Sequence, residues 1–277
     1  MRSSVGSKSA KYISYLLVFL FLVWISVPLL VVFNQSFKPT LIMFSDPPKW
    51  IFKPTLEHYY KVFARQQLHK FMFNSLVVGL STTVLSLVLG SLAGYSLARI
   101  DMKGKEKWAF LILLCKMIPA GALVVPMYYI VRRLGLANTY VGLIVAHTTF
   151  SLPFVVWMMR SFFQEIPVEL EQAAMVDGCS RLGAFWRITA PLAAPGLTAT
   201  GILTLLLSWN EFLFAVVLSG RNTRTLPIGI SAFIGSVSID WGGSSAAAVV
   251  AMVPVFIAGL MVQKYLVRGL TMGAVKG

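Results

Sequence analysis

A series of long apolar runs, almost free of charge, restricts the fold of this chain more than any other feature. About 20 consecutive apolar residues carry an α-helix across the hydrocarbon core of a bilayer. Backbone N–H and C=O groups find no water in lipid, so runs of this length form helices that satisfy them internally. We therefore predict an all-α polytopic membrane protein with six transmembrane helices, at about 12–33, 71–97, 108–131, 140–162, 196–219 and 246–267.

The composition agrees with this class. Of the 277 residues, 57% are apolar and only 12% are charged, whereas soluble domains carry roughly 25% charged residues. The net charge of +14 would also suit a nucleic-acid-binding protein. However, Lys and Arg cluster at the ends of the apolar runs, where they act as topology signals. We therefore predict a lipid bilayer as the surroundings and no nucleic-acid partner.

A long polar interruption separates the fourth and fifth apolar runs. Pro167 suits the first turn of a helix, where its missing N–H is not needed, and Glu169 and Glu171 then lie near the positive end of the helix dipole. Gly178 is predicted to end this helix, and Ser180 to cap a second short helix. The sequence therefore predicts two short helices with a bend between two membrane spans.

Three small residues, Ala173, Ala174 and Gly178, leave the first short helix with little bulk on one side. Small side chains let another backbone approach closely. This pattern is typical of a surface that is pressed into the groove of a partner.

The Gln-Ala-Ala sequence at residues 172–174, with Gly178, Ile188 and Pro191 at their spacings, resembles the cytoplasmic loop of binding-protein-dependent ABC importer permeases. The resemblance implies that residues 163–190 form a coupling loop that docks into a cleft on a separate ATP-hydrolysing subunit. An ordinary amphipathic loop would not require this spacing.

The resemblance implies docking residues on and just after the first short helix: Glu169, Glu171, Gln172, Ala173, Ala174, Asp177 and Gly178. The sequence departs from the family pattern at Gln172, where glutamate is usual, and at Ala190, where leucine is common. The first departure removes an ion pair to the ATPase at that position. Glu171 is adjacent but points about 100° away around a helix.

A second resemblance lies in the fifth apolar run. Residues 209–212, Trp-Asn-Glu-Phe, resemble the signature in the fifth span of sugar-type permeases. The similarity continues through residues 225–229 and the closing Gly-Leu-Thr-x-Gly-x-Val-Lys-Gly sequence. Over residues 12–277 the chain is similar to the smaller permease subunit of maltose-type systems.

The resemblance implies a permease subunit of an importer for a carbohydrate, polyol or similar solute, not an enzyme. It implies a second homologous permease subunit, two ATPase subunits and an external solute-binding protein as partners. ATP and Mg would be bound by the ATPase, and no cofactor is expected in this chain, which has no GxxxxGK[ST] loop. It also implies a bacterial-type inner membrane location with both termini in the cytoplasm.

Candidate residues of the substrate pathway are Lys116, Tyr128, Trp209, Asn210 and Glu211. Ionisable side chains within a membrane span are costly and face protein or water. Asn210 and Glu211 therefore either line a pathway or bond to neighbouring helices, and Lys116 either contacts a polar substrate or pairs with Glu211. The aromatic residues either contact solute or belong to the core or interfacial belt. An ion-coupled secondary transporter using Glu211 and Lys116 is an alternative, but it leaves the docking loop unexplained.

Two further patterns give expectations about structure. His58 and His69 lack a third ligand, so we predict exposed loop residues and no metal site. Gly90 and Gly94 have the spacing that lets membrane helices approach closely, which predicts a packing role.

Overall fold

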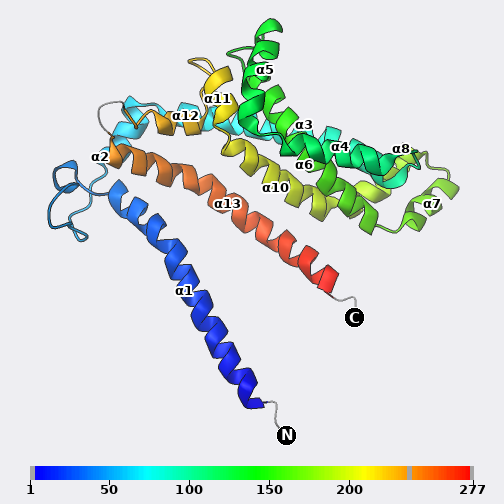
Figure 1. Ribbon diagram of the computed structural model, residues 1–277, viewed down its shortest axis with the longest axis horizontal. Helices are drawn as coiled ribbons and strands as arrows, with labels where there is room; N and C mark the ends of the chain where they lie inside the picture. Colours follow the sequence, from blue (N-terminus) through cyan, green and yellow to red (C-terminus); the bar gives the residue numbers. More distant parts are fainter. Residues whose placement is uncertain (1–3, 236–238, 275–277) are drawn as a thin grey trace. The chain divides into compact units, whose positions relative to one another are not determined.

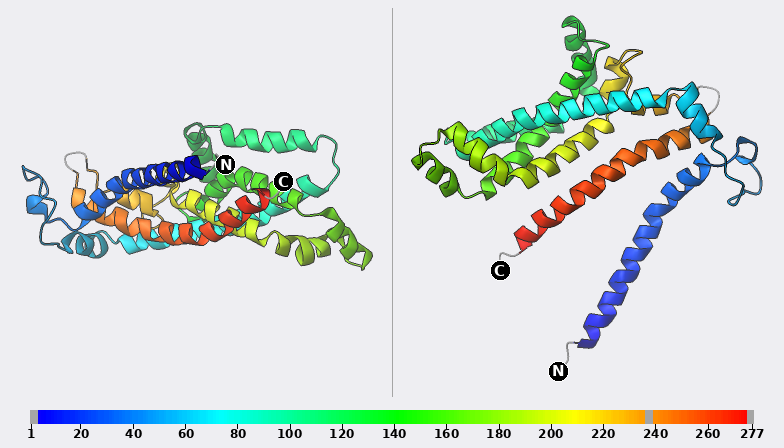
Figure 2. Two further views of the ribbon diagram at one scale, coloured as in Figure 1. Left: turned by 90° about the horizontal axis from the view of Figure 1, so that it is seen from below. Right: turned by 180° about the vertical axis from the view of Figure 1, so that it is seen from behind.

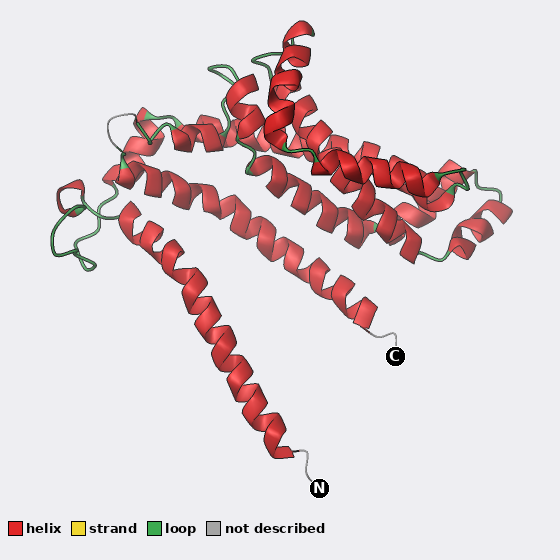
Figure 3. Cartoon of the chain, in the orientation of Figure 1, coloured by secondary structure: helices red, strands yellow, loops and turns green. Residues whose placement is uncertain are grey.

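The structure is a computed structural model that describes residues 4–235 and 239–274, and it consists of helices and connecting loops (Figure 3). Apart from one isolated bridge between Ile234 and Ile239, these described residues contain no β-structure. The helical class predicted from the sequence is therefore confirmed. The chain forms two compact units, the first comprising Met1–Leu68 and Ile230–Met252, and the second His69–Gly229 and Val253–Gly277.

The helices are as follows. The first unit contains α1 (Ser4–Ser36), a 3-10 turn at Thr40–Ile42, α2 (Glu57–Tyr60) and a π-helical turn at Lys61–Arg65. The second unit contains α4 (Lys105–Met117), α5 (Ala120–Arg133), α6 (Tyr140–Glu165), α7 (Val168–Val176), α8 (Arg181–Ala184), a π-helical turn at Phe185–Thr189, α9 (Ala190–Leu192), α10 (Ala194–Trp209) and α11 (Leu213–Leu218). Residues of both units occur in α3 (Leu68–Arg99), α12 (Leu226–Ser231) and α13 (Trp241–Ala274).

Among the described residues, four helical stretches are long and apolar enough to cross a membrane: Ala10–Ser36, Leu68–Arg99, Tyr140–Glu165 and Trp241–Met261. Two further pairs of helices meet the same criterion together but are sharply bent. The number of candidate spans is therefore four, or six if each bent pair forms one span.

The first bent pair lies in the span predicted at residues 108–131, where Pro119, Gly121 and Pro126 predict a disturbed helix. Helix α4 ends at Met117, α5 begins at Ala120, and the two meet at 94°. Pro119 disfavours the helical conformation of the residue before it, and Ile118 is extended, with φ −67° and ψ 125°. The proline was visible in the sequence, but the size of the turn was not predicted.

The predicted fifth span, residues 196–219, is also discontinuous. Helix α10 ends at Trp209, and α11 begins at Leu213 after a three-residue break. At the other end of α10, the helical segment Arg181–Leu192 meets it at 75°. The polar Asn210 and Glu211 therefore lie in a break between helices, not within one continuous helix.

Within the second unit, α6 packs beside both α4 and α10 (Figure 1; Figure 2). Helix α3 also approaches α6 closely. A Cβ added at Gly94 would lie 2.9 Å from the backbone nitrogen of Arg160, and one added at Gly90 would overlap Val155. The predicted packing role of the two glycines is therefore confirmed.

In the first unit, a buried histidine corrects one prediction. His58 lies in α2 and is only 2% exposed, with its Nε2 2.8 Å from the carbonyl oxygen of Lys38. His69 is exposed as predicted, but it belongs to α3 and not to a loop. The ion pair between Lys61 and Asp240, at 2.5 Å, joins two segments of this unit that are distant in sequence.

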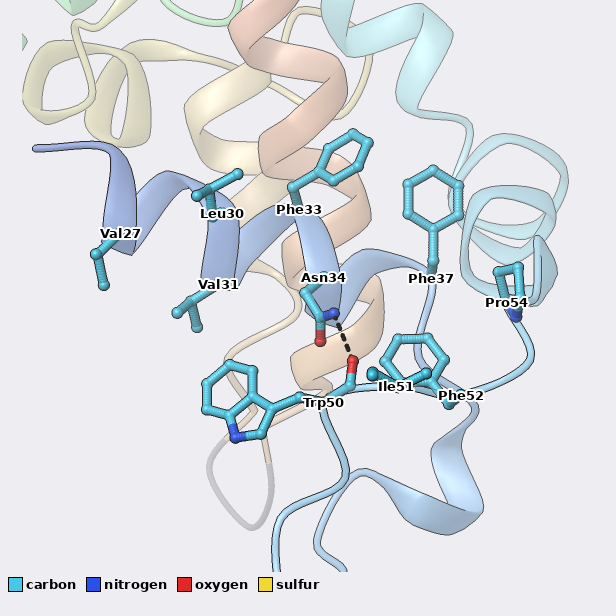
Figure 4. Close-up of a pocket in the computed structure, with 10 residues that line it drawn as sticks. All are labelled: Val27, Leu30, Val31, Phe33, Asn34, Phe37, Trp50, Ile51, Phe52 and Pro54. Carbon is cyan, nitrogen blue, oxygen red and sulfur yellow. Dashed lines mark hydrogen bonds between the residues drawn. The ribbon is translucent and has the colours of Figure 1, made fainter. Parts of the chain in front are cut away.

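An apolar groove lies between the end of α1 and the extended segment of residues 50–54 (Figure 4). The Asn34 side-chain amide donates a 3.1 Å hydrogen bond to the carbonyl oxygen of Trp50 and closes one side of it. None of the predicted site residues lines this groove.

Candidate functional site

The predicted docking loop folds as two short helices, α7 and α8, joined by a tight turn. Helix α7 begins directly after Pro167, whose φ of −56° leads into the helix. It ends with two hydrogen bonds of the Schellman type, from Gly178 N–H to the carbonyl oxygen of Met175 (3.1 Å) and from Cys179 N–H to that of Ala174 (3.0 Å). The predicted helix start and stop are therefore present.

Gly178 has a positive φ of +93°, a conformation that residues with a Cβ rarely adopt. No atom lies within 4 Å of the position that a Cβ would occupy there. The requirement for glycine is thus conformational and not a matter of space. It ends α7 after nine residues and turns the chain into α8.

Ser180 caps α8, because its hydroxyl oxygen accepts a 3.1 Å hydrogen bond from Gly183 N–H. The sequence predicts that this second helix continues through Phe185 and Trp186. It is regular only to Ala184 and then widens into the π-helical turn at Phe185–Thr189.

Most of the predicted docking residues are exposed: Glu169, Gln172, Ala173, Asp177 and Gly178. Apolar side chains beside them are exposed as well, with Val176 at 87%, Leu182 at 60% and Trp186 at 58%. Exposed apolar groups gathered on one surface are typical of a protein–protein contact. We give the name coupling face to the exposed residues of α7, of α8 and of the π-helical turn that follows, after the role that the sequence resemblance implies for this loop.

Two predicted docking residues are not on the coupling face. Ala174 is 9% exposed and Glu171 is 4% exposed. The small residues of α7 therefore do not share one side, because Ala173 faces solvent while Ala174 faces the interior. This corrects the grouping expected from the sequence.

Glu171 is bound inside the second unit by two residues of α3. Its Oε1 accepts a hydrogen bond from Arg99 Nε at 2.7 Å, and its Oε2 accepts one from the Tyr95 hydroxyl at 2.8 Å. Burial raises the pKa of the Glu171 carboxyl, but the hydrogen bonds from Arg99 and Tyr95 outweigh burial and hold that pKa below its ordinary value. Glu171 is therefore a charged group of the interior.

The break between α10 and α11 is organised by Glu211. Its two carboxylate oxygens accept backbone hydrogen bonds from Phe214 N–H at 2.8 Å and Ala215 N–H at 3.0 Å. These are N–H groups of the first turn of α11, which have no partner within the helix. Glu211 thus caps α11 from the residues of the break.

His147 of α6 lies against this break and was not predicted as a site residue. It is 1% exposed, with Nδ1 2.7 Å from the Ser208 hydroxyl oxygen and Nε2 3.2 Å from Glu211 Oε2. The signal in the sequence was an ionisable residue inside an apolar run, which is rare unless it has a role. His147 connects α6 to the end of α10 and to the break itself.

The other pathway candidates do not converge. Lys116 donates a 3.2 Å hydrogen bond to the carbonyl oxygen of Phe150, and its Nζ lies 4.3 Å from the centre of that ring. The structure therefore does not form the Lys116–Glu211 pair considered from the sequence. Tyr128 is half-buried on α5, where its hydroxyl accepts a 3.3 Å hydrogen bond from Arg132.

Trp209 and Asn210 are adjacent in sequence but differ in exposure. Trp209 is 4% exposed and belongs to the packed interior. Asn210 is exposed, and its side-chain amide donates to the carbonyl oxygen of Leu206 at 2.9 Å. Of the polar residues in the break, Asn210 is the more accessible.

Residues 4–235 and 239–274 contain no group of three or more His, Cys, Asp or Glu side chains that could hold a metal ion.

Comparison with known proteins identifies the family. Residues 1–272 match the family described as "Binding-protein-dependent transport system inner membrane component". The chain belongs to this family. The resemblance seen in the sequence is thereby confirmed, and the chain is a transport component, not an enzyme.

Several relatives are similar over most of their length. The chain is 40% identical to the sulfoquinovosyl glycerol transport system permease protein SmoH of Agrobacterium fabrum, over 90% of this chain and 88% of the relative. It is 38% identical to the trehalose transport system permease protein SugB of Mycobacterium tuberculosis, over 90% and 92%. It is 35% identical to the trehalose/maltose transport system permease protein MalG of Thermococcus litoralis, over 86% and 89%.

Solved structures share the fold. A chain of a bacterial ABC transporter that imports the acidic polysaccharide alginate matches with a TM-score of 0.80 and 20% identity, covering 96% of this chain and 99% of that one. A chain of the MetNI methionine ABC transporter matches with a TM-score of 0.59 and 20% identity, over 77% and 98%. The predicted all-helical fold is confirmed.

Proposed function

We propose that this chain is one of two permease subunits of an ATP-driven importer and that it forms half of the pathway for a sugar, oligosaccharide or related solute. A second homologous permease subunit, two ATPase subunits and an external solute-binding protein complete the assembly. ATP and Mg bind to the ATPase subunits. Both termini and the coupling face lie on the cytoplasmic side of a bacterial-type inner membrane.

The observation that carries the proposal is the coupling face. A chain of this family needs an exposed surface for the subunit that hydrolyses ATP, and α7, α8 and the π-helical turn after α8 provide one that includes the exposed apolar side chains of Val176, Leu182 and Trp186. The glycine-terminated end of α7 fixes the angle between the two helices. Exposed aromatic and aliphatic side chains of this kind serve as anchors in a partner's pocket.

The solute class rests on the relatives. Named relatives transport trehalose, maltose and sulfoquinovosyl glycerol, and residues 209–212 carry the sequence that suggested a sugar-type permease. Asn210, exposed at the break after α10, offers an amide for a sugar hydroxyl. An ion-coupled secondary transporter gains no support, because Lys116 and Glu211 each have other partners.

The test is reconstitution of the chain with its partner subunits and binding protein in liposomes, followed by uptake of labelled disaccharides. We expect the ATPase to co-purify with the chain and uptake to require ATP and the binding protein. Uptake driven by an ion gradient without ATP would contradict the proposal. Gly178→Asp places a carboxylate at a backbone position with positive φ, and it should abolish assembly or uptake while membrane insertion remains normal.

A further inference from the structure

The buried contacts of Glu171 join segments that are distant in sequence. Glu171 lies on α7, and the two side chains that bind it, Tyr95 and Arg99, lie four residues apart near the end of α3. Residues four apart lie on the same face of a helix. Both carboxylate oxygens of Glu171 are therefore held by one face of α3. We name Tyr95, Arg99 and Glu171 the α3–α7 clamp.

The clamp also includes the end of α6. Arg99 donates a second hydrogen bond, of 2.6 Å, from its guanidinium to the carbonyl oxygen of Ile166, the C-cap residue just after α6. The fork of the guanidinium can bind two acceptors at once, which a lysine ammonium does with less directional control. Arg99 thus fixes the end of α6 and the start of α7 to the same point on α3.

Aromatic packing closes the clamp against water. The Tyr95 ring meets Phe163 of α6 edge-on, with ring centres 5.8 Å apart, and Phe185 beyond α8 at 4.7 Å. Phe163 and Phe185 are almost fully buried, and the side chains of Arg99 and Glu171 are 10% and 5% exposed. A charge pair held in such a site is costly to separate, because either charge left alone lacks both water and a partner.

Neighbouring residues of α7 face in different directions. Glu171 faces the clamp, while Gln172 and Glu169 are exposed. A force applied to the coupling face therefore acts on a helix whose opposite side is fastened to α3. That helix is 32 residues long and is apolar enough to cross a membrane.

We propose that the α3–α7 clamp transmits the displacement of the coupling face to α3, with Glu171 and Arg99 as positioning residues for the coupling of ATP hydrolysis to transport. This inference rests on the proposed function, in which the coupling face contacts the ATPase. Movement of α7 pulls Arg99 through the ion pair, so the end of α3 moves with it. Without the clamp, α7 can move while α3 stays in place.

The experiment measures ATP hydrolysis and uptake together, in liposomes containing the complete transporter and its binding protein. Glu171→Gln keeps the shape of the side chain and removes its charge. A hydrogen bond to a charged group is strong enough that its loss should lower the solute transported per ATP hydrolysed by about tenfold or more. Asp101→Asn, which alters an exposed carboxylate two residues from Arg99, should leave this ratio unchanged.

A second pair of variants tests whether the residues act as one device. Arg99→Gln should lower the ratio as Glu171→Gln does, and the double variant should be no worse than either single one, because coupled residues give non-additive effects. Additive losses would overturn the proposal.

Tyr95→Phe removes one hydrogen bond and keeps the aromatic packing, so it tests the clamp even if the charge variants fold poorly. We expect a smaller drop, of about two- to fivefold, in the solute transported per ATP hydrolysed.

The outcomes separate this inference from the proposed function. A normal ratio in Glu171→Gln overturns the clamp, while the proposed function stands as long as the unaltered chain binds its ATPase. Loss of the ATPase on purification of Glu171→Gln also overturns it, since Glu171 would then act in assembly. If the unaltered chain itself shows no ATP-dependent uptake, the proposed function fails.

Discussion

Two carboxylates are withdrawn from solvent in the second unit, and they are held in different ways. Glu171 binds Arg99 and Tyr95, which belong to another helix more than 70 residues earlier in the chain. Glu211 binds backbone N–H groups three and four residues ahead of it, and its Oε2 lies 3.2 Å from Nε2 of His147 in α6. One carboxylate is bound by an arginine and a tyrosine of a distant helix, and the other combines a cap on the adjacent helix with a contact to His147.

The difference indicates what each site can do. A buried pair with arginine, whose charge is permanent, resists separation of the helices that carry it. A helix cap fixes where its own helix begins, and the further contact of Glu211 with His147 holds the break against α6. The clamp at Glu171 is therefore suited to transmitting movement, and the break at Glu211 is suited to presenting polar groups at a fixed place between α10 and α11.

Among the variants that test the difference between the two carboxylates, Arg99→Ala is expected to lower stability the most. It leaves the Glu171 carboxylate buried without its cation, which costs about 3–5 kcal/mol in similar pairs. The thermal stability of the purified protein in detergent should fall accordingly. Arg132→Ala is a suitable control, because Arg132 is exposed and its guanidinium binds the Tyr128 hydroxyl of its own helix. Equal melting temperatures for the two variants would contradict the clamp as a structural element.

Gly178→Ala is expected to have the next largest effect, because alanine at a φ of +93° is strained by about 1–3 kcal/mol. The strain loosens the end of α7 and so disturbs the clamp and the coupling face together. Gly104 also has a positive φ, of +76°, and open space around it, but it precedes α4. Gly104→Ala should cost similar stability and leave binding of the ATPase intact. Equal loss of ATPase binding in both variants would show that the effect is general.

Glu211→Gln tests the second of the two carboxylates. The amide retains one oxygen to accept a backbone N–H of α11 and loses the second acceptor. Loss of a cap interaction costs about 0.5–2 kcal/mol. We expect normal assembly, a slightly lower melting temperature, and altered transport if the break serves the pathway. Labelling of a cysteine at position 211 by water-soluble reagents should succeed, and labelling only by membrane-dissolved reagents would place the residue against lipid.

The smallest effect is expected from Gln172→Glu. Gln172 is exposed on the coupling face, and an exposed ion pair contributes about 0–1 kcal/mol. The variant should be tolerated or should slightly strengthen binding of the ATPase, measured by co-purification at low and high salt. A complete loss of transport would show that this position requires a neutral side chain.

Local signals in the sequence predicted much of the coupling region. Pro167, Gly178 and Ser180 mark helix ends through their own backbone preferences, and the structure has helix ends at these places. The packing of Gly90 was equally visible, because small residues spaced four apart in a membrane helix indicate the close approach of a second helix. Such signals act over one or two turns, so they are readable without knowledge of the fold.

The bend at Pro119 and the interruption after Trp209 are features whose geometry the sequence did not predict. Pro119 predicted a disturbance in the third apolar run but not a turn of 94°. The interruption after Trp209 contains no proline or glycine, and its cause is the cap that Glu211 forms with α11. His147 completes that site from α6, and no pattern in the sequence placed it beside Ser208.

The sequence by itself determined the family, the helical class and the ends of α7, because these depend on spacing, hydropathy and backbone preference. Only the tertiary structure decided that Glu171 turns inward while Gln172 faces solvent. Adjacent residues differ by about 100° around a helix, so the sequence offered both as docking residues. The choice depends on where Arg99 and Tyr95 lie, because a carboxylate is stable in the interior only where donors are already in place to bind it.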